Sequence, residues 1–217
     1  MINYEIFKEF KKEFDEEYCS GVFSDELDLL GYRDQVVDNW VCNSNSRLFG
    51  KVRTLTLKEI ETDDEKISRG LGFLASLKSG EVLFVKGSDS FAYFGELMTR
   101  LSVEIGISGA VIDGLTRDTF YTQTVDFPVY AKGYTPRDIK GRGRVEETDI
   151  EVILENISVK PNDYIFADSD ALVVIPQSIY KELMLKVNGA CLEEKEIKNK
   201  ISSGVSVKDI LLNHKSF

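Results

Sequence analysis

Two apolar strands with a helix between them constrain this chain of 217 residues more than any other feature. Residues 81–87 (EVLFVKG) and 109–114 (GAVIDG) are typical of buried strands, and residues 93–106 have helical spacing. A crossover of this length makes the two strands parallel. Because ligands bind beyond the carboxyl ends of such strands, we expect any chemistry around residues 88–98 and 113–118.

The rest of the sequence also predicts a mixed α/β fold in one domain, residues 1–217, without internal repeats or linkers. Amphipathic spacing predicts a helix over about residues 2–18, and the segment 178–213 is helical with an interruption near Asn188-Gly189. Ser206 and Asp209 form a capping box for a last short helix. The remaining predicted elements are a helix over 71–77 and strands over 50–57, 128–133, 151–157, 163–168 and 171–176.

Charge and hydropathy exclude several classes of protein. A net charge of −10 repels phosphate backbones, so we expect no nucleic-acid partner, and we interpret Lys140, Arg142 and Arg144 as part of a solvated Gly-rich loop. No apolar run reaches the roughly 18 to 20 residues that span a bilayer, and charged residues occur in every turn of the predicted N-terminal helix. We therefore expect a cytoplasmic protein without a membrane partner.

The histidine and cysteine content excludes several kinds of site. The single histidine, His214, cannot support a catalytic triad based on histidine or a two-histidine metal motif. Cys19, Cys42 and Cys191 are far apart and form no C-x-x-C pair, so neither a disulfide framework nor a zinc ribbon is indicated.

The helix of the β-α-β unit opens with the segment GELM, which begins at Gly95. Backbone N–H groups in a first helical turn have no internal partner, and the helix dipole favours an anion there. The N–H groups of Leu97 and Met98 are therefore candidates to bind a substrate carboxylate.

Arg117 and Asp118 follow the second strand, where Gly114 permits a sharp turn. An arginine can stabilise a developing enolate, a carboxylate at Asp118 can anchor Mg²⁺ or Mn²⁺, and Glu96 can orient a metal-bound water. Each charge alone is more typical of a solvated loop or helix end than of a functional site. Their shared position at strand and helix ends favours the functional interpretation.

Four blocks stand in order over about residues 20–176: SDELDLLGY, FGELMTRLSVEIGISGAVIDGLTRD, PVYAKG and VKPNDYIFADSDALVVIP. Together they resemble the RraA-like family, which includes 4-hydroxy-4-methyl-2-oxoglutarate/4-carboxy-4-hydroxy-2-oxoadipate aldolases and associated oxaloacetate decarboxylases. The aldolases are similar in having an acidic residue, usually Asp, then twenty positions and Arg-Asp, which is the spacing of Glu96 and Arg117-Asp118. The resemblance implies a layered α/β/β/α sandwich of the swivelling-domain-like type.

The resemblance also implies a role for each candidate residue. Asp118 would bind the metal directly and Glu96 through a water, while Arg117 would hold the oxo acid and stabilise the pyruvate enolate. The positions of Gly95, Leu97 and Met98 would receive the substrate carboxylate. The same Lewis-acid chemistry would serve retro-aldol cleavage and decarboxylation.

Family members further borrow a glutamate from the C-terminal helix of a neighbouring subunit. Glu193, Glu194 and Glu196 all fall in the corresponding LEEKE segment, and each is equally typical of a solvated helix face. A shared site would make activity depend on a homotrimer or hexamer, with both terminal helical segments at subunit interfaces.

The family namesake, a regulator of ribonuclease activity, is similar in fold but departs from the aldolase pattern at the aspartate after the arginine. Asp118 is retained here, which favours an enzyme over a non-catalytic binding protein such as a ribonuclease inhibitor. Some members carry a methyltransferase name, but Gly141-Arg142-Gly143 is only a weak G-x-G. We interpret Asp168 and Asp170 as turn residues.

Overall fold

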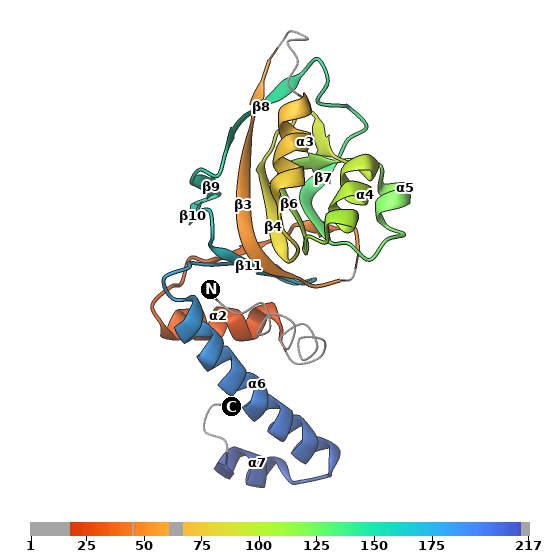
Figure 1. Ribbon diagram of the computed structural model, residues 1–217. Coiled ribbons are helices and arrows are strands. Elements are labelled where there is room, and N and C mark those ends of the chain that lie inside the picture. The colour runs from red at the N-terminus through yellow and green to blue at the C-terminus, as the bar shows by residue number, and fades with distance from the viewer. Residues whose placement is uncertain (1–17, 45, 61–66, 214–217) are drawn as a thin grey trace. The chain divides into compact units, whose positions relative to one another are not determined.

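The computed structural model describes residues 18–44, 46–60 and 67–213 (Figure 1). The helix predicted over residues 2–18 therefore lies outside the described residues, apart from Tyr18. None of the helices in these ranges combines the length and the apolar content that a membrane-spanning segment requires.

The chain divides into two compact units. The larger unit spans Arg33–Tyr180 and contains both halves of the candidate site, and the smaller unit combines the terminal segments, up to Tyr32 and from Lys181. The expectation of a single domain stays a prediction.

The described residues of the larger unit form twelve strands: β1 (Val36–Asp38), β2 (Val41–Cys42), β3 (Leu48–Glu59), β4 (Glu81–Lys86), β5 (Ala92–Phe94), β6 (Gly109–Thr116), β7 (Val129–Tyr134), β8 (Gly143–Thr148), β9 (Val152–Leu154), β10 (Ile157–Val159), β11 (Tyr164–Ala167) and β12 (Ala171–Ile175). Ten of them form one mixed sheet in the order β1-β12-β11-β3-β4-β6-β7-β2, with β5 on β6 and β8 on β3. The neighbours β3, β4, β6 and β7 run parallel. Their carboxyl ends therefore share one edge of the sheet.

Both faces of this sheet are covered (Figure 1). Helices α3 (Ile67–Ser76) and α4 (Glu96–Ile105) cover one face, and the β9–β10 hairpin covers the other. Along β4, Val82 and Phe84 belong to the core beside the hairpin, whereas Leu83 and Val85 belong to the core beside the helices. Burial on both sides explains the continuous apolar run of this strand, and the predicted α/β class is confirmed.

The predicted β-α-β unit is also confirmed. β4 and β6 pair in parallel, from Val82 opposite Gly109 to Lys86 opposite Asp113, and α4 lies between them in sequence. The start of the helix differs from the prediction, because residues 92–94 form the short strand β5. Their side chains alternate between buried and partly exposed, as in a strand, and the helix begins only after Gly95.

Two segments of the larger unit differ from prediction. Residues 151–157 do not form one strand: the chain reverses between β9 and β10, where Glu155 adopts a positive φ of 53°. Arg144 lies in the strand β8, not in a loop, while Lys140 and Arg142 lie in the turn before it.

The predicted hairpin of β11 and β12 is confirmed, with antiparallel pairing from Tyr164 opposite Ile175 to Ala167 opposite Leu172. In its turn, the Asp168 carboxylate accepts hydrogen bonds from the backbone N–H groups of Asp170, at 3.0 Å, and Ala171, at 3.3 Å. Asp168 is therefore a turn residue, as predicted.

The smaller unit is helical. Helix α6 (Tyr180–Ser202) is continuous through Asn188-Gly189, so the predicted interruption is wrong. An isolated glycine costs a helix only about 1 kcal/mol, which the turns on both sides outweigh. Helix α2 (Ser20–Leu29) was not predicted, because no clear apolar stripe marks it.

Helix α7 (Val207–Asn213) has the predicted cap at Ser206. The Asp209 N–H donates to the Ser206 hydroxyl oxygen at 3.2 Å, and this hydroxyl donates to the Asp209 carboxylate at 2.6 Å. In a full capping box the Asp209 side chain would accept the backbone N–H of Ser206. Here it accepts the Ser206 hydroxyl group instead.

A buried carboxylate joins three of the parallel strands near their carboxyl ends. The Asp113 side chain is 1% exposed and lies between Lys86 of β4 and Lys132 of β7, with Lys132 Nζ at 2.7 Å. Lys86 also donates to the backbone oxygen of Ile153 in β9, at 2.7 Å. The hydrogen bond and the charge of Asp113 raise the pKa of Lys132 above its usual value of 10.5.

We expect Asp113→Asn to lower the free energy of unfolding by about 1–3 kcal/mol at pH 7, because two ammonium groups lose their shared anion. Since the folded-state pKa of Lys132 is raised, its contribution is fully present below about pH 10.5 and is lost as the pH rises through that pKa. Urea unfolding at several pH values measures this. The difference from the wild type should shrink in alkaline buffer, and Asp170→Asn in the exposed turn should change stability by less than about 0.5 kcal/mol.

Candidate functional site

The carboxyl end of β6 is fixed against β5. The Thr116 hydroxyl donates to the Phe94 carbonyl oxygen at 2.6 Å, and the Arg117 N–H donates to the same oxygen at 3.0 Å. The next residue, Asp118, turns into the left-handed region with φ 61° and ψ 38°, and the short helix α5 (Thr119–Thr122) follows. The turn directs the Asp118 carboxylate toward the start of α4.

The start of α4 lies against Arg117 and Asp118. The Glu96 N–H donates to Asp118 Oδ2 at 2.9 Å. A Cβ atom at Gly95 would lie 2.4 Å from that oxygen and 2.9 Å from Arg117 Cγ, so only a glycine permits this approach. The two segments that the sequence places at the ends of a strand and a helix thus form one site.

Two backbone donors remain at this helix end. The N–H of Thr99 bonds the Gly95 carbonyl at 2.9 Å, and that of Glu96 bonds Asp118. The N–H groups of Leu97 and Met98 have no acceptor among the residues that the structure describes. The Leu97 side chain is 74% exposed, so the helix end is open to solvent and can receive an anion.

The Arg117 guanidinium lies between two carboxylates. Its Nε is 3.4 Å from Asp118 Oδ2, and its Nη1 is 3.0 Å from Asp138 Oδ2. Asp138 follows β7 and was not among the predicted site residues. Applying the rule of strand carboxyl ends to β7, as it was applied to β4 and β6, would have identified it.

The Glu96 carboxylate points along its own helix. It accepts a hydrogen bond from Arg100 Nε at 2.8 Å and forms an ion pair with Nη2 at 2.7 Å. The Arg100 guanidinium lies 4.0 Å from the centre of the Tyr121 ring. Glu96 and Asp118 are each 39% exposed. This ion pair is on the surface, so it is weak and an incoming ligand can displace it.

The oxygen donors fit a hard divalent ion bound partly by water. No cluster of three or more acidic, cysteine or histidine side chains suited to a metal occurs within residues 18–44, 46–60 and 67–213. The Asp118 carboxylate is directed at the helix end, whereas that of Glu96 becomes available only when it leaves Arg100. Mg²⁺ is commonly bound by one or two carboxylates and completes its shell with water and substrate oxygens.

The three glutamates of the LEEKE segment lie on α6, in the smaller unit. Glu194 pairs with Lys198 at 3.2 Å and Glu196 with Lys200 at 2.6 Å, each one helical turn further on. Their role, and that of Glu193, stays a prediction.

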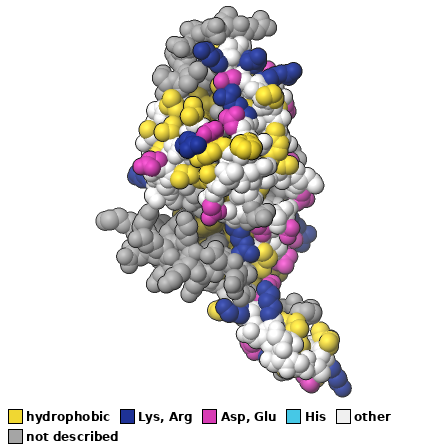
Figure 2. All heavy atoms as spheres, turned by 90° about the vertical axis from the view of Figure 1, so that its right-hand side faces the viewer, with side chains coloured by type: hydrophobic (Ala, Val, Ile, Leu, Met, Phe, Trp, Pro, Cys, Tyr) yellow, Lys and Arg dark blue, Asp and Glu magenta, His cyan; other side chains and the backbone are white. Residues whose placement is uncertain are grey.

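Apolar side chains are exposed beside the candidate site. Leu97 and Leu101 of α4 are 74% and 45% exposed, and Phe120 of α5 is 93% exposed. Figure 2 shows hydrophobic side chains among charged ones on this side of the larger unit. Arg117 and Asp118 directly precede α5. Large contiguous apolar patches mark contact surfaces, whereas single exposed apolar side chains are normal.

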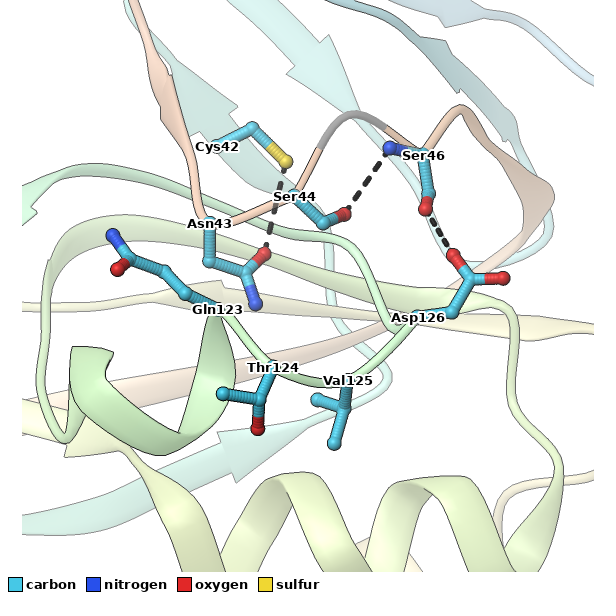
Figure 3. Close-up of a pocket in the computed structure, with 8 residues that line it drawn as sticks. All are labelled: Cys42, Asn43, Ser44, Ser46, Gln123, Thr124, Val125 and Asp126. Atoms are coloured by element: carbon cyan, nitrogen blue, oxygen red, sulfur yellow. Dashed lines mark hydrogen bonds between the residues drawn. The ribbon is translucent and has the colours of Figure 1, made fainter.

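A separate hollow of about 450 Å³ is lined by other residues (Figure 3). Asn43 in its wall donates to the carbonyl oxygens of Thr122, at 2.6 Å, and Phe127, at 3.1 Å, and it accepts the Val129 N–H at 2.6 Å. Ser46 bonds Asp126 across the opening. These contacts hold the chain before β3 against the start of β7, and none of the predicted site residues lines the hollow.

Known proteins similar in sequence include an aldolase and a much longer protein. The 4-hydroxy-4-methyl-2-oxoglutarate aldolase of Thermus thermophilus is 31% identical over 134 residues, which are 61% of this chain and 77% of that protein. Protein DlpA of Legionella pneumophila is 22% identical over 191 residues, 87% of this chain. This chain spans only 31% of the length of DlpA.

A solved structure is similar in fold. Streptomyces coelicolor RraAS2, described as an unusual member of the RNase ES inhibitor RraA protein family, is 24% identical with a TM-score of 0.70. The match covers 84% of this chain and 91% of that one. The family model described as "RraA-like: Aldolase/RraA" matches residues 21–174. With the greater part of its length matched, this chain belongs to the RraA-like family.

Proposed function

We propose that this chain is a divalent-metal-dependent lyase that cleaves a 4-hydroxy-2-oxo acid to release pyruvate and also decarboxylates oxaloacetate. One observation carries the proposal: a guanidinium, a carboxylate and an open helix N-terminus meet at Arg117, Asp118 and Gly95. The name of the Thermus thermophilus relative supports the reaction class.

The helix end suits the carboxylate of the oxo acid. The N–H groups of Leu97 and Met98 and the positive end of the α4 dipole would bind it without a special side chain. The guanidinium of Arg117, whose stem packs over Gly95, would then lie beside the 2-oxo group. As the C3–C4 bond breaks, negative charge develops on the 2-oxo oxygen, and Arg117 stabilises it.

Asp118 would bind Mg²⁺ or Mn²⁺ directly, and Glu96 would bind it through a water once its pair with Arg100 opens. Such an ion, when bound, supplies a Lewis acid for the 2-oxo group. The position of the Asp118 carboxylate at the helix end, where it accepts the Glu96 N–H, supports this role.

We further propose a cytoplasmic homotrimer or hexamer whose site receives Glu193, Glu194 or Glu196 from a neighbouring subunit. The exposed Leu97 and Phe120 support a subunit contact beside the site.

A non-catalytic binding or regulatory protein, for example a ribonuclease inhibitor, is the second candidate. Two observations favour it: the Glu96 carboxylate is occupied by Arg100, and RraAS2 is described within an inhibitor family. An assay separates the two functions, because a binder would release no pyruvate from any 2-oxo acid.

The purified chain with Mg²⁺ or Mn²⁺ should release pyruvate from oxaloacetate or 4-hydroxy-4-methyl-2-oxoglutarate, and EDTA should abolish this. Asp118→Ala should lower kcat/KM by about 100-fold or more, because it removes the proposed direct metal ligand. A coupled lactate dehydrogenase assay measures pyruvate release by the wild type and by the variant. Asp170→Ala serves as the control and should retain activity, whereas a wild type inactive with every metal and oxo acid would favour the binder.

Gly95→Ala should lower kcat/KM by about 10- to 100-fold, since the added Cβ would displace both Asp118 Oδ2 and Arg117 Cγ from the helix end. Gly72→Ala is the matched control, because a Cβ at this α3 position meets nothing within 4 Å. It should leave the activity intact and stabilise the helix by roughly 0.5–1 kcal/mol. Equal activity of the two variants would contradict the close approach at Gly95.

A further inference from the structure

We propose that Asp138 is the positioning residue for Arg117: its carboxylate sets the direction in which the guanidinium presents its remaining N–H groups to the oxo acid. This inference rests on the proposed function, because the oxo acid is the substrate proposed above.

The guanidinium is bound at two different nitrogens. Asp138 Oδ2 lies 3.0 Å from Nη1, and Asp118 Oδ2 lies 3.4 Å from Nε. Two anions beside different nitrogens of a planar group restrict its rotation more than one anion would. Neither of these closest contacts uses Nη2, so Nη2 is the nitrogen that we expect to meet the ligand.

The Asp138 carboxylate is itself held in place. Its second oxygen, Oδ1, accepts the Lys140 N–H at 3.3 Å, and its backbone oxygen accepts Arg142 Nη1 at 3.0 Å. The segment is attached to the start of β5, because Ala92 N–H donates to the Arg137 oxygen at 2.8 Å and Ala92 forms a bridge with Asp138. Asp138 therefore offers a fixed anion.

Stability does not explain the pair between Arg117 and Asp138. The side chains are 30% and 44% exposed, and ion pairs this accessible contribute little to folding. Asp118 cannot fix Arg117 alone, because its nearer contact is with the α4 end and the proposed metal would draw on the same carboxylate. Asp138 is neither bonded to the α4 end nor a proposed metal ligand.

Asp138→Asn should lower kcat by about 10- to 100-fold, because a guanidinium that rotates spends less time in the productive direction. KM for oxaloacetate should stay the same or fall, since the loss of a negative charge beside Arg117 favours anion binding. Asp138→Glu should recover part of kcat. Arg117→Ala shows how far kcat falls when the guanidinium is absent.

The matched control is Asp149→Asn. Asp149 binds Arg53 at 2.6 Å and is 40% exposed, so this variant breaks the same kind of pair at similar exposure within the larger unit. It should keep the wild-type kcat. An Asp138→Asn enzyme with wild-type kcat, or with a raised KM alone, would overturn the positioning role.

A second measurement needs neither metal nor turnover. In ¹⁵N NMR of the wild type, the Arg117 Nε–H should exchange slowly with solvent and show restricted motion, and Asp138→Asn should increase both exchange and motion. Unchanged Arg117 signals would overturn the inference even in an active enzyme. A wild type without lyase activity would instead refute the proposed function, while the NMR comparison would still decide whether Asp138 orders Arg117.

Discussion

Parallel pairing of β3, β4, β6 and β7 is the constraint on which the larger unit depends. It brings four strand ends to one edge of the sheet, so loops that are far apart in sequence meet there. Arg117 and Asp118 come from the loop after β6, and Asp138 comes from the loop after β7. Strand direction, more than any local motif, therefore brings the charged groups together.

The β-α-β unit and the edge that carries the site could be predicted from sequence, because apolar runs and helical spacing are local signals. The same rule applied to β7 would have marked the loop that carries Asp138. Its contact with Arg117 could not be predicted, since only the register of β6 with β7 makes the two residues neighbours. The reversal at Glu155 was missed for a related reason. Neither glycine nor proline marks it, and the packing of the hairpin on the sheet stabilises it.

A glutamate at position 96, where similar aldolases usually have aspartate, has a structural explanation. Its length lets the carboxylate reach Arg100 one turn along α4, and Arg100 also covers the Tyr121 ring. A side chain shorter by one methylene would reach this partner less easily. Such surface pairs stabilise a helix by only about 0.3–0.5 kcal/mol. The contact therefore orders the helix end, but Glu96 can leave Arg100 readily.

The left-handed backbone conformation of Asp118 limits which residues can replace it. At φ 61° a β-branched or bulky side chain is strained, whereas asparagine and glycine adopt the conformation readily. A descendant that acquired Asp118→Asn or Asp118→Gly would keep the bend after β6 while losing the negative charge. Backbone geometry thus leaves open an evolutionary path on which this charge is lost while the fold is kept.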